Sequence, residues 1–175
     1  MDYITKPVKR IQLRKFATIF RYLFGIAPTE RIKVLDVLDR FHSVFDNVSY
    51  VVLEDYEMPP NIPARCSIQE NEGTFRIEIK NTVYVGAYEK NIGAFLDFIC
   101  HEMCHVFLYR IGFTPIMNRS FDNGKIPAYC SVEWQAKALC GEIMMPYEAT
   151  KNMTVEEIMK VYGVSRDSAR YRKRY

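Results

Sequence analysis

The chain has 175 residues, of which 49% are hydrophobic and 26% are charged, with a formal net charge of +3. This composition is that of an ordinary globular protein with a single core, and no repeat, low-complexity tract or linker divides it. Its five cysteines are an odd number and follow no secretory leader. They exclude a disulfide-stapled secreted domain and predict reduced thiols in a cytoplasmic protein.

Charge is distributed unevenly along the chain. Residues 1–40 carry nine Lys and Arg against four Asp and Glu, residues 41–150 carry eight against fourteen, and residues 151–175 carry seven against three. An acidic middle would favour a basic substrate, but the same pattern is equally typical of a solvated surface. Composition leaves both interpretations open.

Two amphipathic helices are predicted near the N-terminus. Apolar residues recur at three- and four-residue steps over residues 13–24 and again over 32–45, where Pro28-Thr29 is expected to begin the second helix. Basic Arg21 interrupts the apolar run at residues 16–20 too early for a signal peptide or a membrane span. We therefore expect both apolar stripes to face the core, with no membrane contact.

Three short strands are predicted next, at Val48–Leu53, Ala64–Gln69 and Thr74–Lys80. They are rich in β-branched residues, and the third shows a clean alternation of apolar and polar side chains. The turn-forming sequence Asn71-Glu72-Gly73 predicts that the last two strands form a hairpin.

The most informative motif is His101-Glu102-Met103-Cys104-His105, an HExxH sequence within a predicted helix over residues 92–107, for which Gly112 offers a stop. Positions i and i+4 of a helix share one face about 6 Å apart, so both imidazoles can reach one tetrahedral Zn²⁺. Glu102 is offset by one residue and would instead take a proton from the water on the ion. Two histidines on a helix can also be core residues, but the motif in this helical setting favours a metal site.

Two imidazoles leave a catalytic zinc short of a third protein ligand. Glu133 is the best candidate because it opens a second predicted helix, over residues 131–145, which Pro146 terminates. The competing carboxylates are Asp122, Glu142 and Glu148, and the candidate soft ligands are Cys130 and Cys140. A thiolate suits a structural zinc better than a hydrolytic one, and free cysteines are more often small hydrophobic residues. Spacing alone does not choose among these ligands.

The HExxH motif and two later segments together resemble the ImmA/IrrE family of zinc metallopeptidases. That family pairs an HExxH helix with an E-x-x-A segment and an LLMP-like stretch, matched here by Glu133-Trp134-Gln135-Ala136 and Ile143-Met144-Met145-Pro146. The match covers roughly residues 70–170 and departs from the family pattern at Cys104 and Lys137, neither of which is an expected ligand.

The resemblance implies an α+β, zincin-like fold with N-terminal helices, a small sheet, the HExxH helix and a helical C-terminus. It implies that His101, His105 and Glu133 hold Zn²⁺ and that Glu102 is the catalytic base. We expect residues 1–150 to form the metallopeptidase domain and residues 151–175 to form a helix-turn-helix-like extension packed on it.

The function implied by the resemblance is limited proteolysis of a protein partner inside the cell. The expected partner is a helix-turn-helix repressor of a mobile element or a stress response. A sheet edge beside the HExxH helix would bind an extended substrate by strand addition, and Thr74–Lys80 and residues 83–85 are both candidates for that edge. The alternatives are a general cytosolic metallopeptidase and a DNA-binding regulator in which the zinc is structural.

The C-terminal residues are the basis of the DNA-binding alternative. Residues 154–162 and 166–175 are predicted to form two short helices around Gly163, with Thr154 and Ser165 as N-caps. Their basic side chains could make a weak contact with DNA phosphates. These side chains are Arg166, Arg170, Arg172, Lys173 and Arg174. A complete module normally has a third helix, which favours docking of a partner or coverage of the domain's base.

Two further roles stay open at the level of sequence. The group that stabilises the oxyanion has five candidates: His42, Tyr84, Tyr109, Tyr129 and Tyr147. Asp97 lies one turn before His101, where it would either orient an imidazole or be an exposed helix aspartate.

Overall fold

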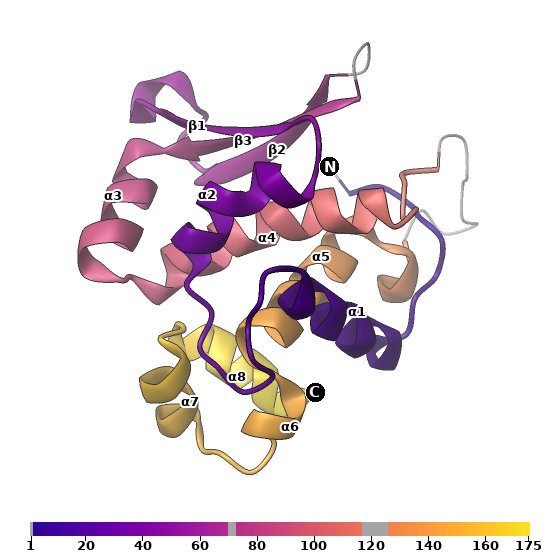
Figure 1. The fold of residues 1–175 in the computed structure, drawn as a ribbon, viewed down its shortest axis with the longest axis vertical. Coiled ribbons are helices and arrows are strands. Elements are labelled where there is room, and N and C mark those ends of the chain that lie inside the picture. The colour runs from indigo at the N-terminus through magenta and orange to yellow at the C-terminus, as the bar shows by residue number, and fades with distance from the viewer. Residues whose placement is uncertain (1, 70–72, 117–125) are drawn as a thin grey trace.

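A computed structural model describes residues 2–69, 73–116 and 126–175 (Figure 1). Within them the chain is an α+β protein with eight α-helices and one three-stranded mixed sheet, as the sequence predicts at that level. The elements are α1 Arg10–Leu23, α2 Val34–Val44, β1 Val48–Leu53, β2 Ala64–Gln69, β3 Thr74–Lys80, α3 Asn81–Lys90, α4 Gly93–Arg110, α5 Val132–Met144, α6 Tyr147–Thr150, α7 Val155–Tyr162 and α8 Arg166–Arg174.

The sheet has the strand order β1-β3-β2, with β3 parallel to β1 and antiparallel to β2. All three strands have the predicted bounds, and the β2–β3 hairpin is confirmed, although residues 70–72 of its turn lie outside the described part of the chain. Both predictions for the free edge are wrong. β3 is the central strand, because both of its edges pair with neighbouring strands. Its alternating apolar residues are buried on one face of the sheet. Residues 83–85 lie in α3, where Val83 and Ala87 face the core at helical spacing.

Helix α4 lies at the centre of the molecule, between the sheet and helices α1 and α5 (Figure 1). It contains the predicted HExxH helix, and its residues Ile99, Met103 and Val106 are fully buried. Apolar side chains surround much of the helix, as is typical of a helix enclosed by its own protein. Among the described residues, no single helix is long and apolar enough to cross a membrane. The pair α3 and α4 meets that criterion only as a broken span bent by 118°.

Helix α2 begins later than predicted, at Val34 with Lys33 as its N-cap. The residues from Ala27 to Glu30 do not join the helix, and three of their carbonyl groups accept hydrogen bonds from side chains outside this segment. Buried Arg21 donates to the carbonyl oxygens of Ala27, at 2.6 Å, and of Glu30. The Tyr162 hydroxyl donates to the carbonyl of Thr29 at 3.1 Å.

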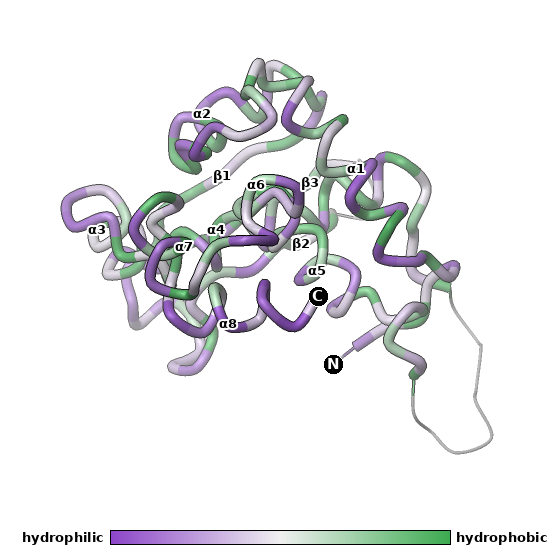
Figure 2. Tube along the Cα trace, turned by 90° about the horizontal axis from the view of Figure 1, so that it is seen from below, coloured by the Kyte–Doolittle hydropathy of each residue, from purple (hydrophilic) through white to green (hydrophobic). Residues whose placement is uncertain are grey.

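The C-terminal helices α7 and α8 form as predicted, and the hydroxyls of Thr154 and Ser165 cap them. They pack closely on the start of α4, since a Cβ atom at Gly93 would lie only 2.6 Å from the carbonyl carbon of Val164. Most of α8 is hydrophilic (Figure 2), yet its Arg172 is buried in an ion pair with Glu142 at 2.8 Å. Arg172 is therefore not available to DNA phosphates, which corrects that part of the prediction.

Candidate metal centre

The neighbouring helices α4 and α5 bring together the histidines of the HExxH motif and the expected third ligand. His101 and His105 project from adjacent turns of α4, and Glu133 lies in the first turn of α5. The Nε2 atoms of the two histidines are 3.0 Å apart. Glu133 places Oε2 3.2 Å from Nε2 of His101 and Oε1 3.6 Å from Nε2 of His105. These three side chains converge on one point and could share a metal ion.

The start of α5, and with it Glu133, is held by the N-terminal residues. Ser131 caps the helix by accepting a hydrogen bond from the Trp134 amide at 2.8 Å. Asp2 accepts from the Ser131 hydroxyl at 2.6 Å and from the backbone amide of Glu133 at 3.2 Å. An isolated bridge between Ile4 and Ser131 joins the two segments. Sequence reasoning missed the role of Asp2, because no local pattern connects residues that are 131 positions apart.

The electrostatics of this cluster suit a cation. Hydrogen bonds with His101 and then with His105 hold the pKa of the Glu133 carboxyl well below its usual range. Burial acts to lower the pKa of His105, but the hydrogen bond with Glu133 and the charge of Glu102 outweigh it and raise that pKa. A metal ion would replace the protons that these groups share and would satisfy the same lone pairs.

Glu102 lies beside the two histidines, near enough to belong to the same group of possible ligands. One ligand atom from each of His101, Glu102 and His105 lies within 4.8 Å of the others. Burial raises the pKa of the Glu102 carboxyl, while the two histidines and the backbone amide of Cys66 act to lower it. Glu102 is therefore a carboxylate whose proton affinity is enhanced, next to the centre on which the ligands converge.

A cleft of about 480 Å³ opens beside the cluster. Its lining includes Glu102, His105 and Glu133 on the helical side and residues of β2 on the other. Because β2 is an edge strand, one row of its backbone groups is unpaired within the sheet. The backbone amide of Lys80 on β3 donates to the carbonyl oxygen of Pro63, just before β2. In the register that this pair sets, the backbone groups of Ala64, Cys66 and Ile68 point away from β3.

Cys66 of β2 lines the cleft together with Glu102. Burial raises the pKa of the Cys66 thiol to about 12, and the charge of Glu102 adds to this effect. The thiol is therefore protonated at neutral pH, which makes it a small apolar lining residue of the cleft and not a nucleophile.

The competing ligands that the sequence offers lie elsewhere or outside the described residues. Glu142 is buried against arginines, and Glu148 is exposed and paired with Lys151. Asp122 falls in the part of the chain that is not described. Cys130 lies in the short 3₁₀ turn before α5. Cys140 belongs to a separate cluster with Cys100 and Cys104, which the i, i+4 spacing of the latter two could have signalled.

Of the candidates for oxyanion stabilisation, Tyr109 lines the cleft. Tyr84 stacks between Tyr50 and Tyr88, and Tyr147 lies against the guanidinium of Arg14. The remaining two are His42, in a depression between α2 and β1, and Tyr129, which is half-exposed before α5.

Asp97 takes neither of the roles considered for it. Its carboxylate accepts hydrogen bonds from the hydroxyls of Ser165, at 3.1 Å, and Ser168. Burial raises the pKa of Asp97, and these two serines act against the rise. Asp97 therefore ties the start of α8 to α4 and does not orient an imidazole.

In comparisons of the sequence with known proteins, no family model matches the chain and no curated protein matches it.

Proposed function

We propose that this chain is a zinc-dependent endopeptidase with a zincin-like active site, as the resemblance to ImmA/IrrE peptidases implies. The observation that carries the proposal is the convergence of His101, His105 and Glu133 next to Glu102, at a cleft bordered by the free edge of β2. Ligands, a base and a strand edge are the three parts that zinc-dependent hydrolysis of an extended peptide requires.

The geometry supports zinc as the ion. Tetrahedral ligands at 2.0–2.1 Å from an ion lie roughly 3.3–3.4 Å from one another. The two imidazole nitrogens are 3.0 Å apart, and the Glu133 carboxylate places Oε2 3.2 Å from one nitrogen and Oε1 3.6 Å from the other, so each contact is close to that value although two different oxygens make them. Two imidazole nitrogens and one carboxylate are a known donor set of hydrolytic zinc, and they leave a fourth position open. Magnesium and calcium prefer oxygen ligands throughout.

The chemistry then divides between the ion and the chain. Zinc, when bound, activates a water as the nucleophile and polarises the scissile carbonyl. Glu102 would accept the proton of that water and pass it to the leaving amine. The backbone groups of Ala64 and Ile68, with the carbonyl of Cys66, would bind the substrate as an added strand, while the amide of Cys66 faces Glu102. Among the candidates predicted from the sequence, Tyr109 lines the cleft and would present its hydroxyl to the oxyanion, and Tyr3 also lines that cleft.

The purified chain is expected to carry about one zinc at the His–Glu centre. Metal analysis after dialysis should show a large loss of zinc in His101→Ala, His105→Ala and Glu133→Ala, because each removes one of the three protein ligands. His42→Ala and Glu148→Ala are matched controls, since these residues lie away from the centre, and they should keep the metal. Normal zinc binding by Glu133→Ala, together with its loss in Asp122→Ala, would show that the third ligand is a different one.

We propose a helix-turn-helix repressor as the substrate, on the strength of the resemblance. The test is to incubate the zinc-loaded chain with a repressor encoded beside its gene and, separately, with unfolded casein, and to map fragments by mass spectrometry. Discrete fragments from one or two exposed sites of the repressor are expected, and they should be absent with Glu102→Gln. An intact repressor with general degradation of casein would instead indicate a general metallopeptidase. No cleavage of either protein would contradict the peptidase itself.

A further inference from the structure

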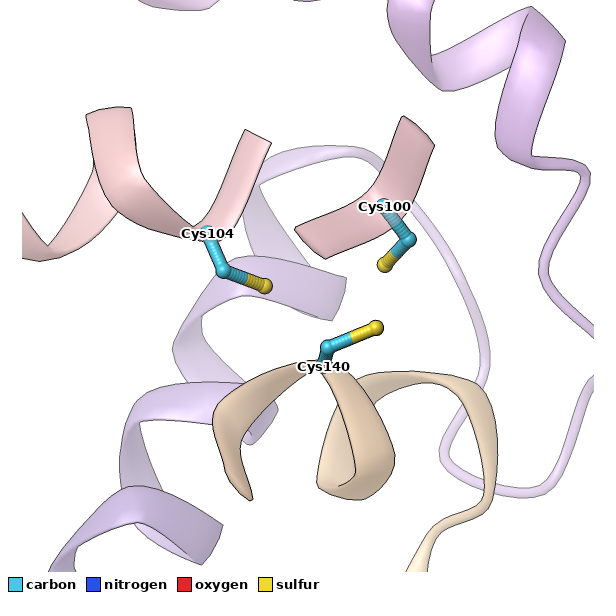
Figure 3. Close-up of side chains that lie close together, drawn as sticks. All are labelled: Cys100, Cys104 and Cys140. Atoms are coloured by element: carbon cyan, nitrogen blue, oxygen red, sulfur yellow. The ribbon is translucent and has the colours of Figure 1, made fainter. Parts of the chain in front are cut away.

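A second set of ligand side chains lies in the same helix pair. Cys100 and Cys104 on α4 and Cys140 on α5 point their sulfur atoms toward one another (Figure 3). The three sulfurs lie within 4.8 Å of one another. Cys100 and Cys104 are fully buried, and Cys140 is 6% exposed. This cluster is separate from the cleft and has no role in the chemistry proposed above.

The two clusters have the same construction. Cys100 and Cys104 repeat the i, i+4 spacing of His101 and His105, displaced by one residue and hence by about 100° around α4. Helix α5 adds one side chain to each pair, Glu133 to the histidines and Cys140 to the cysteines. Because Glu133 and Cys140 are seven residues apart, they lie on one face of α5, about two turns from each other. The packing of α4 on α5 thus forms an open His–Glu centre and a closed sulfur cluster.

The donor atoms of the closed cluster are all sulfur. The thioether sulfur of Met144 lies 3.7 Å from the Sγ of Cys140, one turn further along α5. Thiolate and thioether ligands select soft ions, whereas imidazole and carboxylate suit zinc. A thioether in particular favours Cu(I) over harder divalent ions. The nearby polar contact is the backbone carbonyl of Asp97, to which the Cys140 thiol donates at 3.6 Å.

The separations between the three sulfur atoms also suit the binding of one ion. A point exists within about 2.8 Å of all three sulfurs, because no two of them are more than 4.8 Å apart. Metal–thiolate bonds of about 2.3 Å therefore require only small rotations of the three side chains. Cys140 also lines a surface pocket of about 430 Å³ between α4, α5 and α8, which gives an ion a route from solvent.

We propose that Cys100, Cys104 and Cys140, with Met144 as a neighbouring thioether, form a binding site for Cu(I) that is distinct from the His–Glu centre. Buried Arg21 supplies compensating positive charge, since it donates to the carbonyl of Ile143, the residue before Met144. The ion would join α4 to α5 directly behind the histidines and so hold together the helix pair on which the open centre depends.

The test is a titration of the full-length, reduced chain with Cu(I) under anaerobic conditions, in competition with the chelator bicinchoninate. One tightly bound Cu(I) per chain is expected, with affinity lowered by about 100-fold or more in Cys104→Ser and Cys140→Ser. Cys66→Ser and Cys130→Ser are matched controls, because these cysteines lie outside the cluster, and they should bind as the parent does. The double variant His101→Ala/His105→Ala should also keep copper. Loss of copper in that variant with retention in Cys104→Ser would overturn the proposal.

A measurement on the unmodified chain covers the case in which the serine variants do not fold. X-ray absorption at the copper edge should show sulfur neighbours at about 2.3 Å. A shell of nitrogen or oxygen alone, displacement of the copper by equimolar zinc, or binding no tighter than to the unfolded chain would each overturn the proposal. The last outcome would leave the three cysteines as small apolar residues of the helix interface.

Discussion

Replacing Glu102 with glutamine is expected to lower peptide cleavage by a factor on the order of 10² or more while the chain keeps its fold and its zinc. The amide has the size and hydrogen-bonding groups of the carboxylate but cannot accept a proton. Zinc should remain because the converging ligands are His101, His105 and Glu133. The measurement is kcat/KM on a cleaved peptide, together with zinc content and thermal unfolding.

The stability of Glu102→Gln shows whether a loss of activity comes from the missing base or from misfolding. Burial raises the pKa of Glu102 in the folded chain, so ionisation of this group opposes folding once the pH exceeds the unfolded pKa. The metal-free Glu102→Gln chain should therefore be as stable as the parent, or more stable, at neutral pH and no more stable in acid. Glu148→Gln is the control, since that carboxylate is exposed and far from the cleft. Cleavage by Glu102→Gln at the rate of the parent would remove the proposed mechanism.

Replacing Glu142 with glutamine is expected to lower the free energy of unfolding by about 3–5 kcal/mol. Glu142 is 2% exposed and lies within 2.9 Å of Arg10, 3.4 Å of Arg14 and 2.8 Å of Arg172. These arginines come from α1 and α8, so one carboxylate on α5 joins three helices. Its neutralisation would leave Arg172, which is itself buried, without a counter-charge.

Denaturant unfolding of the metal-free chain measures this effect, with Glu148→Gln as the matched control. The exposed pair between Glu148 and Lys151 should contribute about 0–1 kcal/mol. Replacing Glu142 and Arg172 together by apolar residues should recover part of the lost stability, because both buried charges are then removed. A change of less than about 1 kcal/mol in Glu142→Gln would show that water reaches these guanidinium groups.

The local structure of this protein could be predicted from its sequence because it depends on residues close together in the chain. Helical spacing predicted α4 and α5, period-two alternation predicted β3, and the hydroxyls of Ser165 and Thr154 marked the starts of two helices. The four-residue spacing of the two histidines is likewise a property of one helix. The prediction failed for the start of α2, where the carbonyl groups of Ala27, Thr29 and Glu30 bond to the side chains of Arg21 and Tyr162. Tyr162 is 133 residues from Thr29, and a local sequence pattern cannot indicate such a distant partner.

Only the tertiary structure decided which elements face one another. The sequence left Glu133 among several ligands, and the packing of α4 on α5 brought it to the histidines while burying Glu142 beneath α1 and α8. Strand order made β2 the free edge beside the cleft, although β3 has the clearer strand pattern. The cysteines were visible in the sequence as a repeat of the histidine spacing, but their third member came from α5. Residue spacing within one element follows from backbone geometry, whereas the partner across an interface follows from how whole faces pack.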